Sequence, residues 1–188
     1  MIKSDAIHKA MKIRGLISES ELSLIYDLCD QFVKPNGFVL ETGTFLGRTA
    51  YVIAAAIEER DGKLITIDNY GTIDGEARPE YNGYALSETT TNLLRFSNIE
   101  IIPSHFLVDS LLEHIKGNYD LVFLDGDHRF WNILMELEVC KYWCNNIAGH
   151  DWHDERVKNA VQKMIDTKQF ELVKVNPTEQ GLWQLRKL

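Results

Sequence analysis

The sequence has few cysteines and no spacing that would make them a metal or disulfide framework. Its three cysteines, Cys29, Cys140 and Cys144, are odd in number and form no CxxC or Cys/His pattern. Cys140 and Cys144 lie four residues apart in an apolar stretch, so we expect them on one helical face in the core. This usage favours a reducing compartment.

Three further absences narrow the class of protein. The N-terminus, MIKSDAIHKAMKIRG, is charged throughout and has no apolar h-region, so no signal peptide is expected. No apolar run approaches the length needed to cross a membrane. The formal net charge of −8 disfavours a nucleic-acid or anionic membrane partner, because both attract basic surfaces. We expect a soluble, cytoplasmic protein whose residues 1–188 form one domain.

Short apolar segments alternate with helical patterns along the chain. Ser18 and Glu21 have capping-box spacing and begin a helix within an N-terminal helical extension, residues 1–35. Strands are predicted at 38–41, 63–68, 99–102, 119–125, 146–151, 170–175 and 181–187. Helices are predicted at 47–60, 87–96, 109–115, 130–143 and 155–165.

This order predicts an α/β fold with a doubly wound, mostly parallel, seven-stranded Rossmann-like sheet and an antiparallel C-terminal hairpin. Residues 69–86 show no period and contain glycine and proline, which indicates a loop or a lid. Trp131, Trp143 and Trp183 are expected in the core.

Four of the predicted strands end in acidic residues: Glu41, Asp68, Asp125 and Asp151. The carboxyl ends of parallel strands meet at one edge of a sheet, and ligands of open α/β sheets bind beyond that edge. The four acids therefore predict a ligand site there.

The stretch VLETGTFLG, residues 39–47, leaves the first of these strands through an acid and two glycines. Gly43 and Gly47 allow the backbone to approach a ligand closely, and the helix that follows offers free N–H groups. A pyrophosphate site would favour GxGxxG, whereas ExGxxxG places Glu41 where a cationic group fits better. The alternative is a plain strand-turn-helix with glycines needed for geometry alone.

Asp68 ends the next strand, 27 residues after Glu41. A carboxylate in that place can accept hydrogen bonds from both hydroxyls of a ribose. A helix cap or a surface acid is the alternative interpretation.

The motifs together resemble a known family. ExGxxxG with an Asp on the second strand is similar to the class I S-adenosylmethionine-dependent methyltransferases. LDGDHRF at 124–130 and GHDW at 149–152 followed by VKNAV resemble a small branch of sugar- and antibiotic-tailoring O-methyltransferases. The resemblance covers about residues 36–186.

The resemblance implies S-adenosylmethionine as the cofactor. The residues it places around the methionine part are Glu41, Thr42, Gly43, Thr44 and Gly47. It places Asp68 at the ribose, Asn69 at the adenosine, Ser104 and His105 at the adenine, and Asp125 beside the transferred methyl group. The match at Ser104 and His105 is loose, because the family's usual Gly-Asp pair is absent.

Methyl transfer to a hydroxyl needs positioning and removal of a proton. His128 follows Asp125 closely and titrates near neutrality when unperturbed, so it is the predicted base, with Asp125 beside it as the second catalytic residue. The alternative is that His128 caps the next helix or pairs with Asp127.

A metal ion would be another way to activate the acceptor. By resemblance to catechol-type O-methyltransferases, Asp125, His150 and Asp151 would hold Mg²⁺. The family's Asn is missing and His150 suits Mg²⁺ poorly, although Mn²⁺ would tolerate it. The metal-dependent and metal-free interpretations both stay open.

We expect a small hydroxylated molecule as the acceptor, because the short extension and the 69–86 segment leave little chain for a large cap. The pocket is then either open or completed by a second subunit of a homodimer. Two rival functions remain: an NAD-type dinucleotide-binding oxidoreductase, and a non-catalytic cofactor-binding or interaction protein with the same fold.

Overall fold

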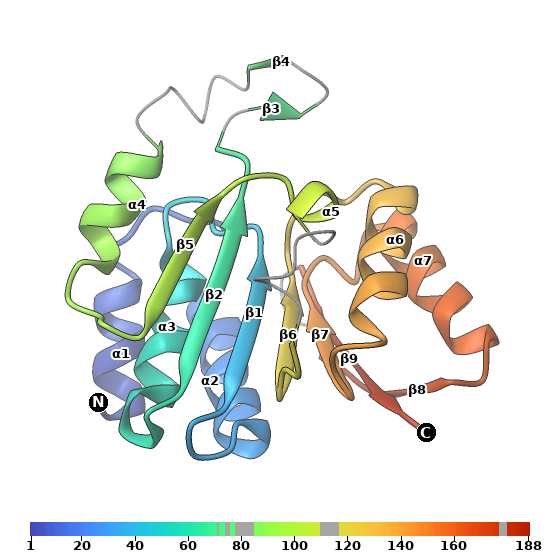
Figure 1. Ribbon diagram of the computed structural model, residues 1–188, viewed down its shortest axis with the longest axis horizontal. Helices are drawn as coiled ribbons and strands as arrows, with labels where there is room; N and C mark the ends of the chain where they lie inside the picture. Colours follow the sequence, from blue (N-terminus) through green and yellow to red (C-terminus); the bar gives the residue numbers. More distant parts are fainter. Residues whose placement is uncertain (71, 74–75, 78–84, 110–116, 177–179) are drawn as a thin grey trace.

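The structure, a computed structural model, describes residues 1–70, 72–73, 76–77, 85–109, 117–176 and 180–188. Its centre is a seven-stranded sheet in the order β5-β2-β1-β6-β7-β9-β8 (Figure 1). The strands are β1 Phe38–Thr42, β2 Lys63–Asp68, β5 Ile99–Pro103, β6 Leu121–Leu124, β7 Asn146–Gly149, β8 Phe170–Asn176 and β9 Leu182–Lys187. All neighbours are parallel except β9, which runs antiparallel to both β7 and β8. The predicted fold class is confirmed.

Helices cover both faces of the sheet (Figure 1). One face carries α1 Lys3–Ala10, α2 Glu19–Phe32, α3 Arg48–Ile57 with its 3₁₀ continuation η1 Glu58–Arg60, and α4 Ala85–Leu93. The other carries α5 Phe106–Asp109, α6 Phe130–Cys140 and α7 Glu155–Asp166. Each face of the sheet packs against its helices in a hydrophobic core. Successive side chains of a strand point to opposite faces, so Val39 packs in the core on the first face and Leu40 in the core on the second.

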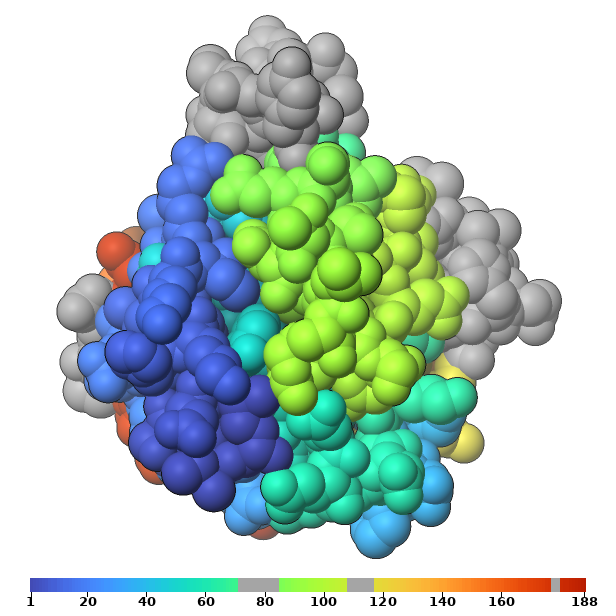
Figure 2. All heavy atoms as spheres, turned by 90° about the vertical axis from the view of Figure 1, so that its left-hand side faces the viewer, coloured from blue at the N-terminus to red at the C-terminus, as the bar shows by residue number. Residues whose placement is uncertain are grey.

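The N-terminal extension is part of the first core. Helices α1 and α2 both pack on α3, and Figure 2 shows the N-terminal segment and the α4–β5 segment on either side of α3. The predicted capping box is present, since Ser18 Oγ accepts from Glu21 N and Glu21 Oε2 accepts from Ser18 N. The Arg48 side chain adds hydrogen bonds to the carbonyls of Ile13 and Ile17, which fasten the segment between α1 and α2 to α3.

Several local predictions differ from the structure. Helix α5 begins at Phe106 rather than 109, and residues 110–115 of the predicted helix lie outside the described residues. Within the predicted 69–86 loop the structure describes two short antiparallel strands, β3 Thr72–Ile73 and β4 Glu76–Ala77; most of the remainder lies outside the described residues. The prediction for Trp131 is wrong: it is 70% exposed, because it lies on the outer face of α6.

Other core predictions are confirmed. Cys140, Cys144 and Trp183 are buried, and Trp143 packs against the second core. The shared helical face predicted for the two cysteines is wrong, because α6 ends at Cys140 and Cys144 forms a β-bridge with Tyr119. Among the residues that the structure describes, no helix combines the length and apolar character needed to span a membrane.

Candidate cofactor and active site

The end of β1 and the turn into α3 are tightly built against β6. Gly43 has φ +87°, and a Cβ there would lie 2.0 Å from the carbonyl oxygen of Asp125. Gly47, with φ +89°, is the N-cap residue of α3, and no side chain caps that helix. Glycine is thus required at 43 by backbone conformation and by space. Thr42 and Thr44 beside it are buried, with Thr44 Oγ1 in a hydrogen bond to Thr66 Oγ1.

Glu41 is a fully buried acid with one unused oxygen. Its Oε2 accepts from Thr66 Oγ1, whereas Oε1 is buried and has no hydrogen-bond partner among the described residues. Burial raises the pKa of Glu41 to about 8, and the nearby carboxylates of Asp125 and Asp68 add to the rise. The acids that end neighbouring strands thus influence one another, as their sequence positions predicted. An unpaired buried carboxyl oxygen is suited to a donor or a cationic group on a ligand.

Asp68 binds the backbone of the two loops around it. Its Oδ2 accepts from Phe45 N at 2.7 Å and its Oδ1 from Tyr70 N at 2.8 Å. Burial raises its pKa, and the two amides partly offset that rise. Each carboxylate oxygen keeps a second lone pair, so these contacts are compatible with hydrogen bonds to a ribose. Asn69 lies next to it and is partly buried.

Ser104 and His105, predicted near the adenine, follow β5 at the same edge of the sheet. His105 Nδ1 accepts from Leu107 N at 3.2 Å, so its ring helps to begin α5. A role of either residue in cofactor binding stays a prediction.

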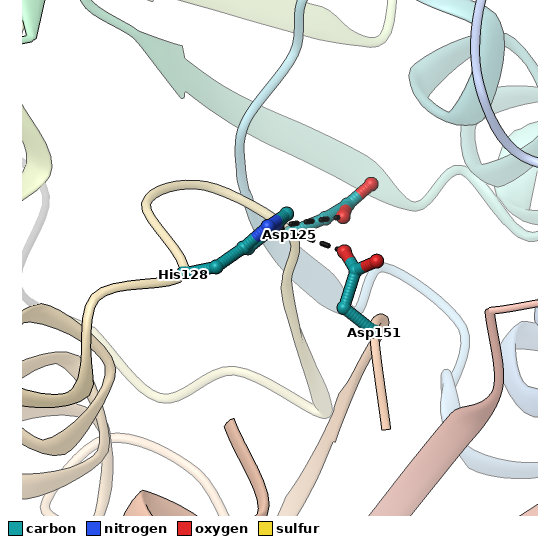
Figure 3. A group of neighbouring side chains, drawn as sticks. All are labelled: Asp125, His128 and Asp151. Atoms are coloured by element: carbon teal, nitrogen blue, oxygen red, sulfur yellow. Dashed lines mark ion pairs between the residues drawn. The ribbon is translucent and has the colours of Figure 1, made fainter. Parts of the chain in front are cut away.

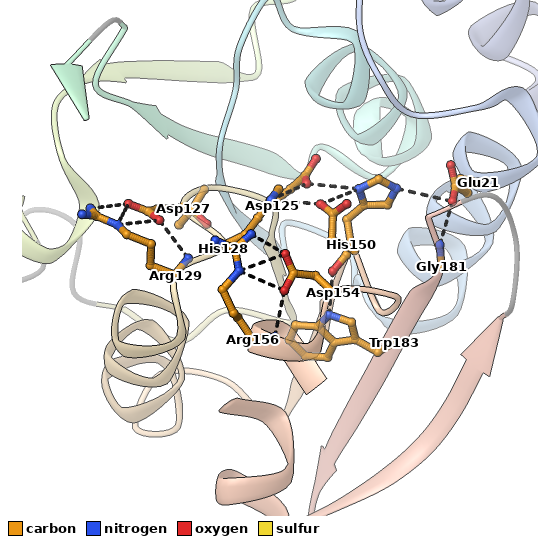
Figure 4. Close-up of polar contacts among 12 residues, drawn as sticks. Glu21, Asp125, Asp127, His128, Arg129, His150, Asp154, Arg156, Gly181 and Trp183 are labelled. Atoms are coloured by element: carbon orange, nitrogen blue, oxygen red, sulfur yellow. Dashed lines mark hydrogen bonds and ion pairs between the residues drawn. The ribbon is translucent and has the colours of Figure 1, made fainter. Parts of the chain in front are cut away.

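Two aspartates and two histidines meet where β6 and β7 end. His128 Nε2 lies 2.9 Å from Asp151 Oδ2 and 3.7 Å from Asp125 Oδ1 (Figure 3). His150 Nδ1 lies 3.1 Å from the same Asp151 oxygen and 3.3 Å from the same Asp125 oxygen. We call Asp125, His128, His150 and Asp151 the four-residue cluster. His128 therefore pairs across the two strand ends, and Asp127 pairs with Arg129 instead (Figure 4).

The charges of the cluster are strongly coupled. Burial would lower the pKa of His128, but Asp125 and Asp151 outweigh it and raise the pKa to about 10. The same two carboxylates raise the pKa of His150 to about 11 against the effect of burial. Burial would raise the pKa of Asp151, but the two imidazoles hold it well below its usual range. The two carboxylates thus favour the protonated form of both imidazoles, and a protonated His128 has no lone pair to act as a base.

The backbone at Asp151 is also unusual, with φ +56° in the left-handed region. Positive φ is uncommon for residues other than glycine, although aspartate adopts it more readily than most. Such positions often occur at functional sites, where the surrounding structure holds the strained residue in place.

Two buried glutamates near the site were not singled out by the sequence as site residues. Glu136 on α6 is 4% exposed and accepts from Thr42 Oγ1 at 3.1 Å. Burial raises its pKa to about 8. Glu21 on α2 is fully buried, and its Oε1 lies 3.4 Å from His150 Nε2. The only sequence signal was the capping box at Glu21, which indicates a helix start and not a position in the site.

Comparison with known proteins identifies the family. The family described as "Methyltransferase domain" matches residues 40–154, more than half of the chain, from the last part of β1 to the N-cap of α7. The chain belongs to this methyltransferase family. The matched region contains Glu41, Asp68 and the four-residue cluster.

One curated relative is the carboxy-S-adenosyl-L-methionine synthase of Shewanella sp. (strain ANA-3), which is 33% identical over 73 residues. That segment is 39% of this chain and only 30% of the relative, so the match covers less than a third of the relative's length.

Solved structures share the fold at low sequence identity. The SAH-bound methyltransferase PaMTH1 of Podospora anserina has a TM-score of 0.72 at 10% identity, covering 98% of this chain and 87% of the other. A SAM-dependent O-methyltransferase from Thermotoga maritima has a TM-score of 0.69 at 15% identity, covering 97% and 71%. A putative RNA methyltransferase from Pyrococcus horikoshii has a TM-score of 0.67 at 12% identity, covering 100% and 98%. Their names differ in the kind of substrate, so the methyltransferase fold alone does not decide the acceptor.

Proposed function

We propose that this protein transfers a methyl group from S-adenosylmethionine to a hydroxyl of a small molecule. The observation that carries the proposal is the arrangement at one sheet edge. A glycine-containing turn with two buried acids, Glu41 and Asp68, lies beside a cluster of two histidines and two aspartates. The family does not favour an NAD-type oxidoreductase.

The residues at β1 and β2 fit this cofactor. Bound S-adenosylmethionine would supply an electrophilic methyl group on a positively charged sulfur. Glu41 has a buried oxygen without a partner, which suits a donor or a cationic part of such a ligand. Gly43 is partly exposed at the end of β1, and Asp68 keeps acceptor capacity for the ribose.

The four-residue cluster also fits a divalent cation, which we propose as part of the function. Each imidazole nitrogen lies 2.9–3.7 Å from the two carboxylate oxygens, about the separation of neighbouring ligands around one ion with bonds of about 2.1 Å. Asp125, His128 and Asp151 each offer one ligand atom, and these three atoms lie within 4.8 Å of one another. Two imidazole nitrogens with two carboxylate oxygens suit Mn²⁺ or a similar ion better than Mg²⁺. A cation bound there would supply positive charge that favours loss of the acceptor's hydroxyl proton.

The roles of His128 and Asp125 depend on that cation. Without an ion, the protons on the two imidazoles balance Asp125 and Asp151, and His128 must lose its proton before it can act as the predicted base. A bound ion would be held by His128 and Asp125 together with His150 and Asp151.

The acceptor class, the oligomeric state and the location are proposed from the comparisons and from the sequence. O-methyltransferases among the solved structures support a hydroxyl acceptor. The acidic net charge supports a small molecule over a nucleic acid. A homodimer that completes the pocket and a cytoplasmic location stay proposals from the sequence.

The test is a screen of hydroxylated acceptors with S-adenosylmethionine, measuring release of S-adenosylhomocysteine in EDTA, in Mg²⁺ and in Mn²⁺. We expect release that depends on Mn²⁺ and is abolished in Asp125→Asn. Asp127→Asn makes the same charge change two residues away, where the carboxylate binds Arg129 and Asn132, and should retain most of the activity.

Each part of the proposal can be refuted separately. Full activity in EDTA would remove the cation and leave methyl transfer in place. Tight binding of S-adenosylmethionine without turnover of any acceptor would favour a non-catalytic binding protein. No binding of S-adenosylmethionine, with tight binding of NAD, would overturn the proposed function.

A further inference from the structure

Glu21 lies outside the family's matched region, yet its side chain reaches the site. It is on the first turn of α2 and has no exposed surface. Oε2 accepts from Ser18 N at 3.0 Å and from Ser18 Oγ at 2.8 Å, which completes the capping box. Oε1 points the other way and accepts from Gln180 N and Gly181 N, both at 3.2 Å, in the turn before β9 (Figure 4). These donors stabilise the ionised carboxylate in a buried position.

The same Oε1 faces the ring of His150. His150 is 4% exposed, and its Nε2 lies 3.4 Å from Glu21 Oε1. Its Nδ1 faces the opposite way, towards Asp125 and Asp151. The backbone of His150 is also held, because its N–H donates to Leu124 O and its carbonyl accepts from Trp183 Nε1 at 2.9 Å.

A neutral imidazole carries one proton, on either nitrogen. A lone pair on Nε2 would face an anionic oxygen at 3.4 Å in a buried place, where electrostatic repulsion is poorly screened. When a bound cation displaces one of the two ring protons, the remaining proton is therefore favoured on Nε2, and the lone pair of Nδ1 is directed at the cluster. Histidines that bind metals are commonly oriented in this way by a carboxylate on the other ring nitrogen.

We propose that Glu21 is a positioning residue of the site: it favours the proton on His150 Nε2, so that the lone pair of Nδ1 is available to a cation held with Asp125 and Asp151. The inference rests on the proposed function, in which the four-residue cluster holds a divalent cation. The Glu21 carboxylate contacts α2, the turn before β9 and His150, so these two segments help to position the His150 ring.

A purely structural role for Glu21 predicts a different result. The capping box needs only Oε2, and the turn before β9 needs only an acceptor oxygen. Glu21→Gln keeps the size and one acceptor oxygen but removes the negative charge that faces His150. If Glu21 were only structural, this variant would change stability without changing the protonation of His150 or the affinity for a cation.

Two measurements on the purified protein without acceptor test the proposal. One is the affinity for Mn²⁺ by titration calorimetry. The other is the NMR signal of the proton on His150 Nε2, with and without Zn²⁺, a diamagnetic ion that also binds imidazole nitrogens and carboxylate oxygens. In Glu21→Gln we expect Mn²⁺ affinity to fall about 10–100-fold and the Nε2 proton signal to shift or to broaden by exchange. Glu19→Gln, an exposed glutamate on the same turn of α2, should leave both unchanged.

An unchanged Mn²⁺ affinity and an unchanged Nε2 proton signal in Glu21→Gln would overturn the proposal. If the wild type binds no divalent cation, the cation part of the proposed function fails. The inference rests on that cation and then fails with it, whereas cation binding by the wild type that is unchanged in Glu21→Gln refutes the inference alone. Should Glu21→Gln fail to fold, Glu21→Asp keeps the charge but moves it away from His150, and the same fall in Mn²⁺ affinity is expected.

Discussion

Cofactor binding should be linked to proton release at Glu41. In this structure the pKa of Glu41 is raised to about 8, first by burial and then by the neighbouring acids. A cationic ligand group beside its unpartnered Oε1 would favour the ionised form. The protein must therefore lose a proton when it binds S-adenosylmethionine at neutral pH.

The magnitude follows from this pKa. At pH 7 about nine in ten Glu41 side chains carry the proton, so binding should release about 0.9 proton. Affinity should rise roughly tenfold per pH unit below pH 8 and level off above it, because the ionised fraction then stops growing. Titration calorimetry in buffers with different ionisation enthalpies measures both quantities.

Glu41→Gln should remove the proton release and flatten the pH dependence of the affinity. Binding of S-adenosylhomocysteine then tells which cationic group of the cofactor faces Glu41, because this ligand keeps the ammonium group and lacks the sulfonium. Equal proton release with both ligands would point to the ammonium group, and release with S-adenosylmethionine alone to the sulfonium. Tight binding with no proton release, or the same pH slope in Glu41→Gln, would refute the reasoning.

Three further predictions concern single residues. Asp68→Asn should weaken cofactor binding by about 1–3 kcal/mol in calorimetry, because the new NH₂ group cannot accept from both backbone amides and a ribose. The exposed Asp61→Asn is its control, and equal affinity for both variants would contradict the prediction. His128→Gln should slow methyl transfer at least tenfold with nearly unchanged cofactor affinity, and an unaffected rate would remove His128 from the mechanism. The pKa of Glu136 is raised from an ordinary 4.5 to about 8. Between these pH values the folded protein binds more protons than the unfolded chain, so the free energy of unfolding falls as the pH rises. Glu136→Gln should thus be about 2–4 kcal/mol more stable than wild type at pH 8 and similar at pH 4.5 in urea unfolding; an equal difference at both pH values would show that Glu136 is not the group that titrates.

The elements of the fold could be predicted because their signals are local. Hydrophobic period and strand-end acids located β1, β2 and β6 to within one or two residues, and the Ser18–Glu21 spacing located the start of α2. Trp131 was misplaced because an aromatic residue on an amphipathic helix gives no sign of which neighbours cover it. Residues far apart in sequence decide that coverage.

The sequence by itself determined that Glu41, Asp68, Asp125 and Asp151 would gather, since parallel strands bring their carboxyl ends to one edge. Only the tertiary structure decided what each acid does there. It buried Glu41 until its pKa rose, set two imidazoles between Asp125 and Asp151, and brought Glu21 from α2 against His150. Burial and distances below 4 Å govern these charges, and both depend on how the helices pack across the sheet rather than on spacing along the chain.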